Sequence, residues 1–391
     1  TVVACVGSVI VEANLLRCDG YSAAAGDGPA PGATLRIVTG QWPPSPYEGD
    51  SPVGFELSAE HEAFRKVVRE FAEREIAPYA ESWDREHVFP EDVVRKMGDL
   101  GLMGLPFDPE YGGQGADFTS LCVAIEEIGR VDQSMGITLE AAVGLGINPI
   151  AEFGSPEQKE RWLPDLLAGR SLAGFGLTED EAGSDAGAIR TKAVLDGDEW
   201  VINGSKAFIT NSGTDLTSVI TVAARTGPEE ISSIMVPAGT EGFVVEPAYR
   251  KMGWHASDTH PLVFNDCRVP FENLLGERGR GFQQFLATLD DGRIGIAALA
   301  TGLAQACLEE SVEYAKTRQA FGGPIGRYQA VAFKCADLET KVEAARLLTY
   351  RAAWLKDQGR PIKQAAAIAK LFASEAAVEA TRIATQIFGG A

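Results

Sequence analysis

The spacing of apolar residues changes twice along the chain, and no other feature constrains the fold as strongly. Apolar residues follow a helical period from about residue 55 to 172, a strand-like pattern from 173 to 280, and a helical period again from 281 to 391. The sequence therefore predicts an α+β multidomain protein: an N-terminal helical bundle, a middle β-barrel-like domain and a C-terminal helical bundle.

The first helical segment begins with a clear amphipathic stripe. Phe64, Val67, Val68 and Phe71 stand at positions i, i+3, i+4 and i+7, and Ser58 is a favourable N-cap. We expect this stripe to face the core of the N-terminal bundle.

The last segment contains three long amphipathic runs, at about 281–316, 327–358 and 362–388. Three helices of this length normally need a fourth to cover the seam between them. Gly389-Gly390 after the last run reads as a helix C-cap that leads into more structure. We therefore expect the C-terminal bundle to be truncated at residue 391.

An acidic turn at the start of the middle segment combines glycine with hydroxyl groups. Gly183 can adopt backbone angles closed to other residues and lets a ligand approach the main chain. Thr178 and Ser184 place hydroxyls beside it, which can donate to phosphate or ring acceptors. On these residues alone, an ordinary surface turn leading into a β-meander remains an equal alternative.

Two dipeptides in the middle segment are typical of β-hairpin turns. Asp196-Gly197 and Asn203-Gly204 both separate runs rich in Val, Ile, Trp and Phe. Further strands are predicted at 218–225, 232–238, 242–248 and 261–269.

The charge balance argues against two classes of partner. With 35 basic and 55 acidic residues the chain carries a net charge of −20, whereas nucleic acids and anionic membrane surfaces need cationic faces. No apolar run reaches the roughly 18 residues of a membrane span. The six cysteines and four histidines show no metal-ligand spacing, so we expect no metal site, free thiols and a cytoplasmic protein.

Residues 1–54 differ in texture from the rest. They are rich in Gly, Ala and Pro and lack the features of a secretory signal. We predict a flexible or atypical extension that the fold does not need, and a docking arm for a partner is the alternative.

Seven motifs occur in an order that resembles the acyl-CoA dehydrogenase family. They are PEYGGQGAD (109–117), EEIGRVDQS (126–134), GSPEQKERWLPDLLAG (154–169), LTEDEAGSDAGAIRTKA (177–193), AFITNSG (207–213), RQAFGGPI (318–325) and QIFGG (386–390). The similarity runs from about Phe55 to the last residue. It implies the family's helical, β and helical domains in this order.

The resemblance implies FAD as the cofactor, with residues from two subunits around it and a homotetramer as the usual assembly. Thr178 would donate to the flavin ring, Phe208 stands where many relatives have Trp, and Arg318 would meet the pyrophosphate of a neighbouring subunit's FAD. The family often has His before Gln329, and here that residue is Tyr328. The implied cofactor residues are Phe175, Leu177, Thr178, Gly183, Ser184, Phe208, Ile209, Thr210, Arg318, Phe321, Gln329, Gln386, Gly389 and Gly390.

The activity that the resemblance implies is α,β-dehydrogenation of an acyl-CoA to a trans-2-enoyl-CoA, with electrons passed to an electron-transfer flavoprotein. Ser184, Asp290 and Arg293 match positions that contact acyl-CoA, and an ion-pair role for Arg293 is the alternative. Residues 289–315 most resemble short-chain members.

The catalytic base is unknown from these residues. Most relatives place a Glu in a Glu-Gly-Thr segment after QIFGG, and some place it at the position of Gly292. Asp291 would point about 100° away on a helix. We therefore expect little turnover from residues 1–391 alone, with rescue by Gly292→Glu if the new carboxylate reaches the α-carbon of the substrate. The alternative function is a non-catalytic or heteromeric relative that binds FAD or CoA without its own base.

Overall fold

The protein's structure is a computed structural model that describes residues 57–390 and three strands of the N-terminal segment. These strands are β1 (Val2–Val6), β2 (Val9–Ala13) and β3 (Ile37–Val38), which pair in the order β1-β2-β3. Residues 1–54 form a unit separate from 55–391. Apart from these strands, residues 1–54 lie outside the described residues. That the fold does not need them therefore stays a prediction.

Short helices make up the first part of the main unit. Ser58 caps α1 as predicted, because its hydroxyl accepts a hydrogen bond from the His61 N–H at 3.1 Å. The predicted stripe is correct for Val68 and Phe71, which are buried, but wrong for Val67, whose side chain is 48% exposed. The surface that α1 covers is narrower than a full i, i+3, i+4 stripe. The helices are α1 (Ala59–Glu75), α2 (Ala80–Glu86), α3 (Glu91–Asp99), α4 (Phe118–Val131), α5 (Gln133–Glu140), α6 (Asn148–Phe153) and α7 (Pro156–Leu167), with a π-helix η3 (Ala141–Ile147) between α5 and α6.

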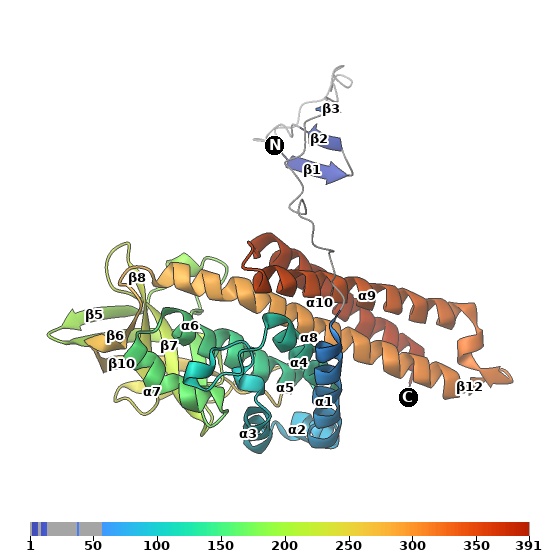
Figure 1. The fold of residues 1–391 in the computed structure, drawn as a ribbon, viewed down its shortest axis with the longest axis horizontal. Coiled ribbons are helices and arrows are strands. Elements are labelled where there is room, and N and C mark those ends of the chain that lie inside the picture. Colours follow the sequence, from blue (N-terminus) through green and yellow to red (C-terminus); the bar gives the residue numbers. More distant parts are fainter. Residues whose placement is uncertain (1, 7–8, 14–36, 39–56, 391) are drawn as a thin grey trace, which may run out of the picture. The chain divides into compact units, whose positions relative to one another are not determined.

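The middle segment folds into one eight-stranded sheet in the order β11-β8-β7-β5-β6-β10-β9, with β4 pairing in parallel to β7 (Figure 1). Its core is apolar and includes Trp200, Ile202, Ile220 and Phe264, each at most 1% exposed. The strands are β4 (Leu172–Gly176), β5 (Lys192–Asp196), β6 (Glu199–Thr210), β7 (Thr217–Arg225), β8 (Ile231–Pro237), β9 (Phe243–Val245), β10 (Thr259–Pro270) and β11 (Leu274–Leu275).

Of the two predicted hairpin turns, one is confirmed and one is wrong. The chain reverses after Asp196, with Gly197 at φ 66° and Asp196 paired with Glu199. Asn203 and Gly204 instead lie inside β6. A Cβ on Gly204 would come within 2.6 Å of the Thr191 Cα, so glycine is needed there for close approach of the backbone and not for a turn.

Three long helices form the C-terminal segment, as the sequence predicted: α8 (Gly281–Thr317), α9 (Gln329–Asp357) and α10 (Lys363–Phe388). A hairpin of β12 (Gln319–Ala320) and β13 (Gly323–Pro324) connects α8 to α9. The buried face of α10 consists largely of alanines, whose small side chains let it lie close against α8 and α9. Figure 1 shows α8 running from the β-sheet to the end at which β12 lies.

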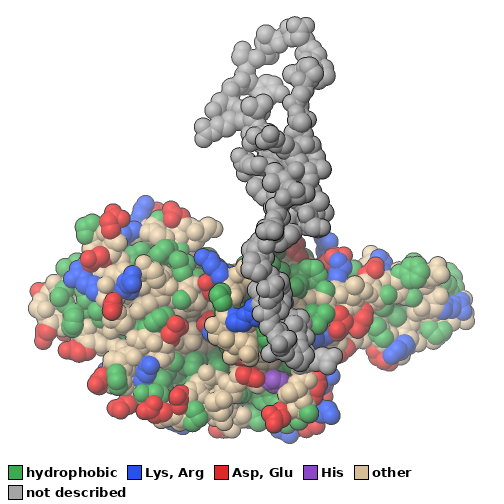
Figure 2. All heavy atoms as spheres, turned by 45° about the horizontal axis from the view of Figure 1, so that its top comes forward, with side chains coloured by type: hydrophobic (Ala, Val, Ile, Leu, Met, Phe, Trp, Pro, Cys, Tyr) green, Lys and Arg blue, Asp and Glu red, His purple; other side chains and the backbone are tan. Residues whose placement is uncertain are grey.

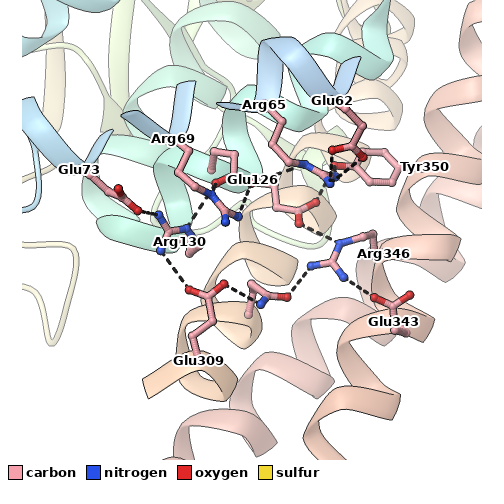
Figure 3. A network of polar contacts seen from close by, with 12 residues as sticks. Glu62, Arg65, Arg69, Glu73, Glu126, Arg130, Glu309, Glu343, Arg346 and Tyr350 are labelled. Atoms are coloured by element: carbon pink, nitrogen blue, oxygen red, sulfur yellow. Dashed lines mark hydrogen bonds and ion pairs between the residues drawn. The ribbon is translucent and has the colours of Figure 1, made fainter. Parts of the chain in front are cut away.

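A buried network of charges joins α1, α4, α8 and α9 (Figure 3). Glu127 accepts two hydrogen bonds from Arg69, at 2.8 and 2.9 Å. Glu126 accepts from the Arg346 Nε at 3.0 Å and from the Tyr350 hydroxyl at 2.7 Å. Both carboxylates of α4 are almost fully buried, and these partners come from α1 and α9, so the network fixes how the three helices pack.

The described surface mixes charges of both signs. On the face shown in Figure 2, Lys and Arg side chains lie singly among acidic and apolar ones. Within residues 57–390, no helix is apolar over a length that could cross a membrane. Cys122, Cys267, Cys307 and Cys335 are free thiols, and no set of His, Cys, Asp and Glu in the described residues is arranged to hold a metal.

Candidate functional site

The turn after β4 is fixed by a buried ion pair. The Lys206 ammonium on β6 donates to the Glu179 carboxylate at 2.7 Å and to the Leu177 carbonyl at 3.0 Å. Glu179 also accepts from the backbone N–H groups of Arg190 and Thr191, at 2.6 and 3.0 Å. Residues 177–179 are therefore held by two bonds from Lys206 of β6 and two from the backbone just before β5, and the Ala207 N–H of β6 adds a fifth bond to the Thr178 carbonyl.

The pKa values of Glu179 and Lys206 are both lowered, for different reasons. Burial acts to raise the pKa of Glu179, but Lys206 and the hydrogen bonds to the carboxylate outweigh it and leave that pKa below its usual value. Burial lowers the pKa of Lys206 to about 8. The pair is charged at neutral pH and rigid, which suits a segment that must present a hydroxyl in one position.

The predicted cofactor residues of this segment differ in exposure. Phe175 is half-buried and packs on Phe285 of α8 with ring centroids 4.3 Å apart. Leu177 is buried in the cluster around that contact, and Thr178 is half-buried. The turn thus packs on an apolar cluster, and the Thr178 hydroxyl lies at its partly exposed edge.

Gly183 does not have the unusual backbone angles that its sequence context suggested. Its φ is outside the positive region, and a Cβ there would meet no atom within 4 Å. Ser184 beside it is exposed. The open space, and not a strained turn, is what leaves the main chain of this segment accessible.

Phe208 is turned outward by a β-bulge. Between the pairs Ile209–His260 and Lys206–Leu262 the register of β6 and β10 shifts, and Phe208 takes φ 61°. Its ring is 62% exposed and packs on Tyr249 at 4.8 Å. Because bulges re-aim side chains, Phe208 presents an aromatic face to the outside while Ile209 stays in the core of the β-sheet and Thr210 is half-buried.

The second set of predicted cofactor residues lies at the other end of α8. Arg318 ends that helix, and Phe321 is 92% exposed at the tip of the β12–β13 hairpin. The ring of Tyr314 stacks on that of Phe388 at 4.4 Å and so brings the end of α10 to the same place. The residues gathered here are Arg318, Phe321, Gln329, Gln386, Gly389 and Gly390, and of these only Arg318 carries a charge.

One chain does not bring the two sets together. Phe285 and Thr317 lie on the same helix, and at 1.5 Å per residue they are about 48 Å apart along its axis. Phe175 of the first set packs on Phe285 near the start of α8, and Arg318 of the second set follows its last residue. A ligand that touches both sets needs a second copy of the chain.

The LDDGR segment in α8 forms ion pairs within the chain. Asp290 pairs with Arg293 one turn later. The carboxylate of Asp291 accepts from Lys356 of α9 at 2.8 Å and from Asn148 at 3.3 Å. Asp290 and Asp291 both line a cavity of about 700 Å³ between α4, η3, α7 and α8. Asp291 is therefore engaged in packing α8 against α9 and α6 and is not a free base.

Gly292 faces a carboxyl group that sequence reasoning missed. A Cβ on Gly292 would lie 3.3 Å from Oε1 of Glu140, the last residue of α5. The expected rescue by Gly292→Glu would introduce a second acidic side chain next to Glu140. One signal was available: between Gln133 and Ala151, Glu140 is the single charged residue in an apolar, glycine-rich run.

Three domain families match this chain in the order in which its helical, β and helical segments occur. Residues 58–170 match the N-terminal domain of acyl-CoA dehydrogenase, residues 174–267 the middle domain, and residues 279–391 the C-terminal domain. The probable acyl-CoA dehydrogenase YngJ of Bacillus subtilis is 48% identical over 341 residues, which are 86% of this chain and 90% of YngJ. The chain belongs to the acyl-CoA dehydrogenase family.

Solved structures of family members have the same fold. Butyryl-CoA dehydrogenase from Megasphaera elsdenii is 41% identical, with a TM-score of 0.84 over 86% of this chain and 90% of that one. A glutaryl-CoA dehydrogenase from Mycobacterium smegmatis in complex with FADH2 is 30% identical, with a TM-score of 0.82 over 85% of each chain. The predicted fold class, the predicted oxidoreductase class and FAD as the cofactor are thereby confirmed.

Proposed function

We propose that this acyl-CoA dehydrogenase oxidises a short acyl-CoA to its trans-2-enoyl-CoA in the cytoplasm and passes the electrons to an electron-transfer flavoprotein. The observation that carries the proposal is the pair of residue sets at the two ends of α8, one built to hold a flat aromatic group and the other carrying the exposed Arg318. The division into domains at 55–172, 173–280 and 281–391 is part of the proposal.

The first set fits a flavin ring. Phe208 offers an exposed aromatic face on a bulge, and Thr178 offers a hydroxyl on a turn that Lys206 and Glu179 hold in place. Gly183 adds an open stretch of main chain beside it. An aromatic face, a fixed donor and accessible backbone N–H groups are what a planar cofactor with a polar rim requires.

The second set fits a negatively charged group. Within residues 57–390, no ion pair or hydrogen bond engages the Arg318 guanidinium, and guanidinium groups bind phosphate oxygens in a bidentate way. Because the sets are about 48 Å apart along α8, Arg318 serves the FAD of another subunit. We therefore propose a homo-oligomer, a homotetramer as in the family, in which each cofactor site draws on two chains.

Bound FAD would supply the hydride acceptor for the β-hydrogen of the acyl group. The chain's own residues orient and shield: Phe175 and Phe208 exclude water, and Thr178 donates from its fixed turn. Asp290 and Arg293, half-buried on α8, would meet the CoA portion, with Arg293 leaving its pair with Asp290 to do so. Asp291 stays with Lys356 and accepts no proton from the substrate.

The test measures cofactor content and flavin reduction separately. Purified protein should be yellow, and anaerobic butyryl-CoA should bleach the flavin absorbance if the protein also supplies the base. Arg318→Met should lower the FAD content at least tenfold, whereas Arg85→Met, an exposed arginine of α2, should leave it unchanged. Protein that takes up no added FAD contradicts the proposal. FAD that no thioester reduces would instead favour the non-catalytic relative.

A further inference from the structure

Glu140 is a buried acid with no partner. It is 2% exposed at the junction of α5 and the π-helix η3. Among the described residues, no side chain or backbone N–H forms a hydrogen bond or ion pair with its carboxyl, and burial is the one influence on its pKa, which rises to about 8. Buried polar groups in folded proteins are nearly always satisfied, so an exception calls for a functional explanation.

Three glycines make room for this carboxyl. A Cβ on Gly144 would lie 3.0 Å from Oε1 of Glu140, and one on Gly292 would lie 3.3 Å from it. A Cβ on Gly295 would come within 2.7 Å of the Glu140 Cγ and 3.1 Å of Oε1. The Glu140 carboxyl therefore lies between η3 and α8 against three glycines, with Leu145 as the nearest apolar side chain to Gly292.

The local helix geometry also points to a ligand. Glu140 precedes seven residues of π-helix, Ala141–Ile147, a conformation that is rare and occurs mostly at functional sites. Gly146 in this helix packs against the backbone of Ala173 in β4, the strand that leads to Phe175. The π-helix thus joins the carboxyl to the strand that precedes the flavin turn.

The Glu140 carboxyl lies between the two parts of the proposed active site. Gly292 stands between Asp290 and Arg293, the residues proposed to meet CoA, and it shares α8 with Phe285, which packs on Phe175. An acyl group that extends from CoA bound at Asp290 and Arg293 toward a flavin near Phe175 passes Gly292, beside which the Glu140 carboxyl lies. This step rests on the proposed function.

We propose that the Glu140 carboxyl forms a hydrogen bond with a polar group on the acyl chain, so that the preferred substrates are short acyl-CoA thioesters whose chain carries a hydroxyl or carbonyl group. At neutral pH the carboxyl is protonated and both donates and accepts, as carboxylic acids in apolar sites can. A purely alkyl chain beside it would leave the carboxyl unsatisfied, and such sites discriminate strongly against analogues that lack the polar group.

The test compares 4-hydroxybutyryl-CoA with pentanoyl-CoA, which has a methyl group in place of the hydroxyl. Both carry the α- and β-hydrogens that dehydrogenation removes. With the full-length holoenzyme and its electron acceptor, kcat/KM should favour 4-hydroxybutyryl-CoA about tenfold. Glu140→Leu should remove or reverse this preference, and Glu140→Gln, whose amide still donates and accepts, should retain it within about threefold.

Glu152→Gln is the matched control. Glu152 is a second acid whose pKa is raised, first by burial and then by Asp291, but it lies on α6 and lines the 700 Å³ cavity. The preference for 4-hydroxybutyryl-CoA should be unchanged in this variant. Equal binding of FAD by all four proteins would show that the fold is intact.

The outcomes distinguish failure of this inference from failure of the proposed function. If butyryl-CoA bleaches the flavin but wild-type protein shows no preference for the hydroxylated chain, the inference is wrong and the proposed function stands. An unchanged preference in Glu140→Leu also overturns it. If no thioester reduces the flavin of full-length protein, the proposed function fails and the inference fails with it. Should Glu140→Leu not fold, the wild-type ratio decides.

Discussion

Two places in this protein bury carboxyl groups, and they do so in opposite ways. Glu126 and Glu127 are 3% and 1% exposed, and arginines and a tyrosine from three helices surround them (Figure 3). Glu140 is 2% exposed and faces glycines. A buried charge that is paired holds helices in register, whereas a buried acid with no partner destabilises the fold unless a ligand uses it. The first arrangement is structural, and the second marks a site.

The largest effect should follow from turning the paired site into an unpaired one. Glu127→Ala leaves Arg69 and Arg130 without their shared carboxylate, which is 1% exposed. Breaking a buried pair in this way costs about 3–5 kcal/mol. Denaturant unfolding measures the loss. Glu62→Gln, which removes an exposed partner of Arg65, should cost about 0.5 kcal/mol, and equal losses in the two variants would contradict the distinction.

The next prediction concerns how the stability of the fold depends on pH through Glu140. The pKa of Glu140 is about 8 in the folded protein against an ordinary value of 4.5, so the folded state holds the extra proton. Its contribution to stability is complete below pH 4.5 and is lost as pH rises through 8. Relative to Glu140→Gln, wild-type protein should lose roughly 3 kcal/mol between pH 5 and pH 8. Parallel stability curves for the two proteins would show that Glu140 does not titrate in this range.

An intermediate effect is expected at the Lys206–Glu179 pair, which fixes the turn after β4. Lys206→Met removes the ammonium from Glu179, but the backbone N–H groups of Arg190 and Thr191 still satisfy that carboxylate. We expect a loss of about 2–3 kcal/mol, smaller than at Glu127, together with lower FAD content. Arg190→Met, which touches an exposed pair with Glu181, is the control and should change neither quantity.

The smallest effects test how much room surrounds Glu140. Gly295→Ala would drive a Cβ to 2.7 Å from the Glu140 Cγ and should destabilise by about 1–2 kcal/mol. In Gly292→Ala the new Cβ meets only the end of that side chain, at 3.3 Å. The gain in helix propensity should outweigh this contact and stabilise the fold by about 0.5 kcal/mol. Opposite signs in thermal unfolding support this packing, and destabilisation by both variants would mean that the carboxyl cannot move.

Local patterns in the sequence predicted the elements well. The three long C-terminal helices, the strands at 218–225, 232–238, 242–248 and 261–269, the Ser58 cap and the Asp196-Gly197 turn are present. Asn203-Gly204 was misread because the same dipeptide that favours a hairpin also suits a strand position where another backbone passes closely. Val67 was misread because a stripe of apolar residues can be wider than the surface it covers.

Periodicity, capping residues and motif order are properties of neighbouring residues, so the sequence by itself determined the fold class, the family and FAD. The tertiary structure decided what depends on residues far apart in the chain. It pairs Asp291 with Lys356 and places the two sets of proposed cofactor residues at opposite ends of α8. It also brings the Glu140 carboxyl next to Gly292 with no partner. The chemistry of a carboxyl group is the same in every sequence. Only the groups that folding brings around it determine whether it forms an ion pair, titrates or binds a ligand.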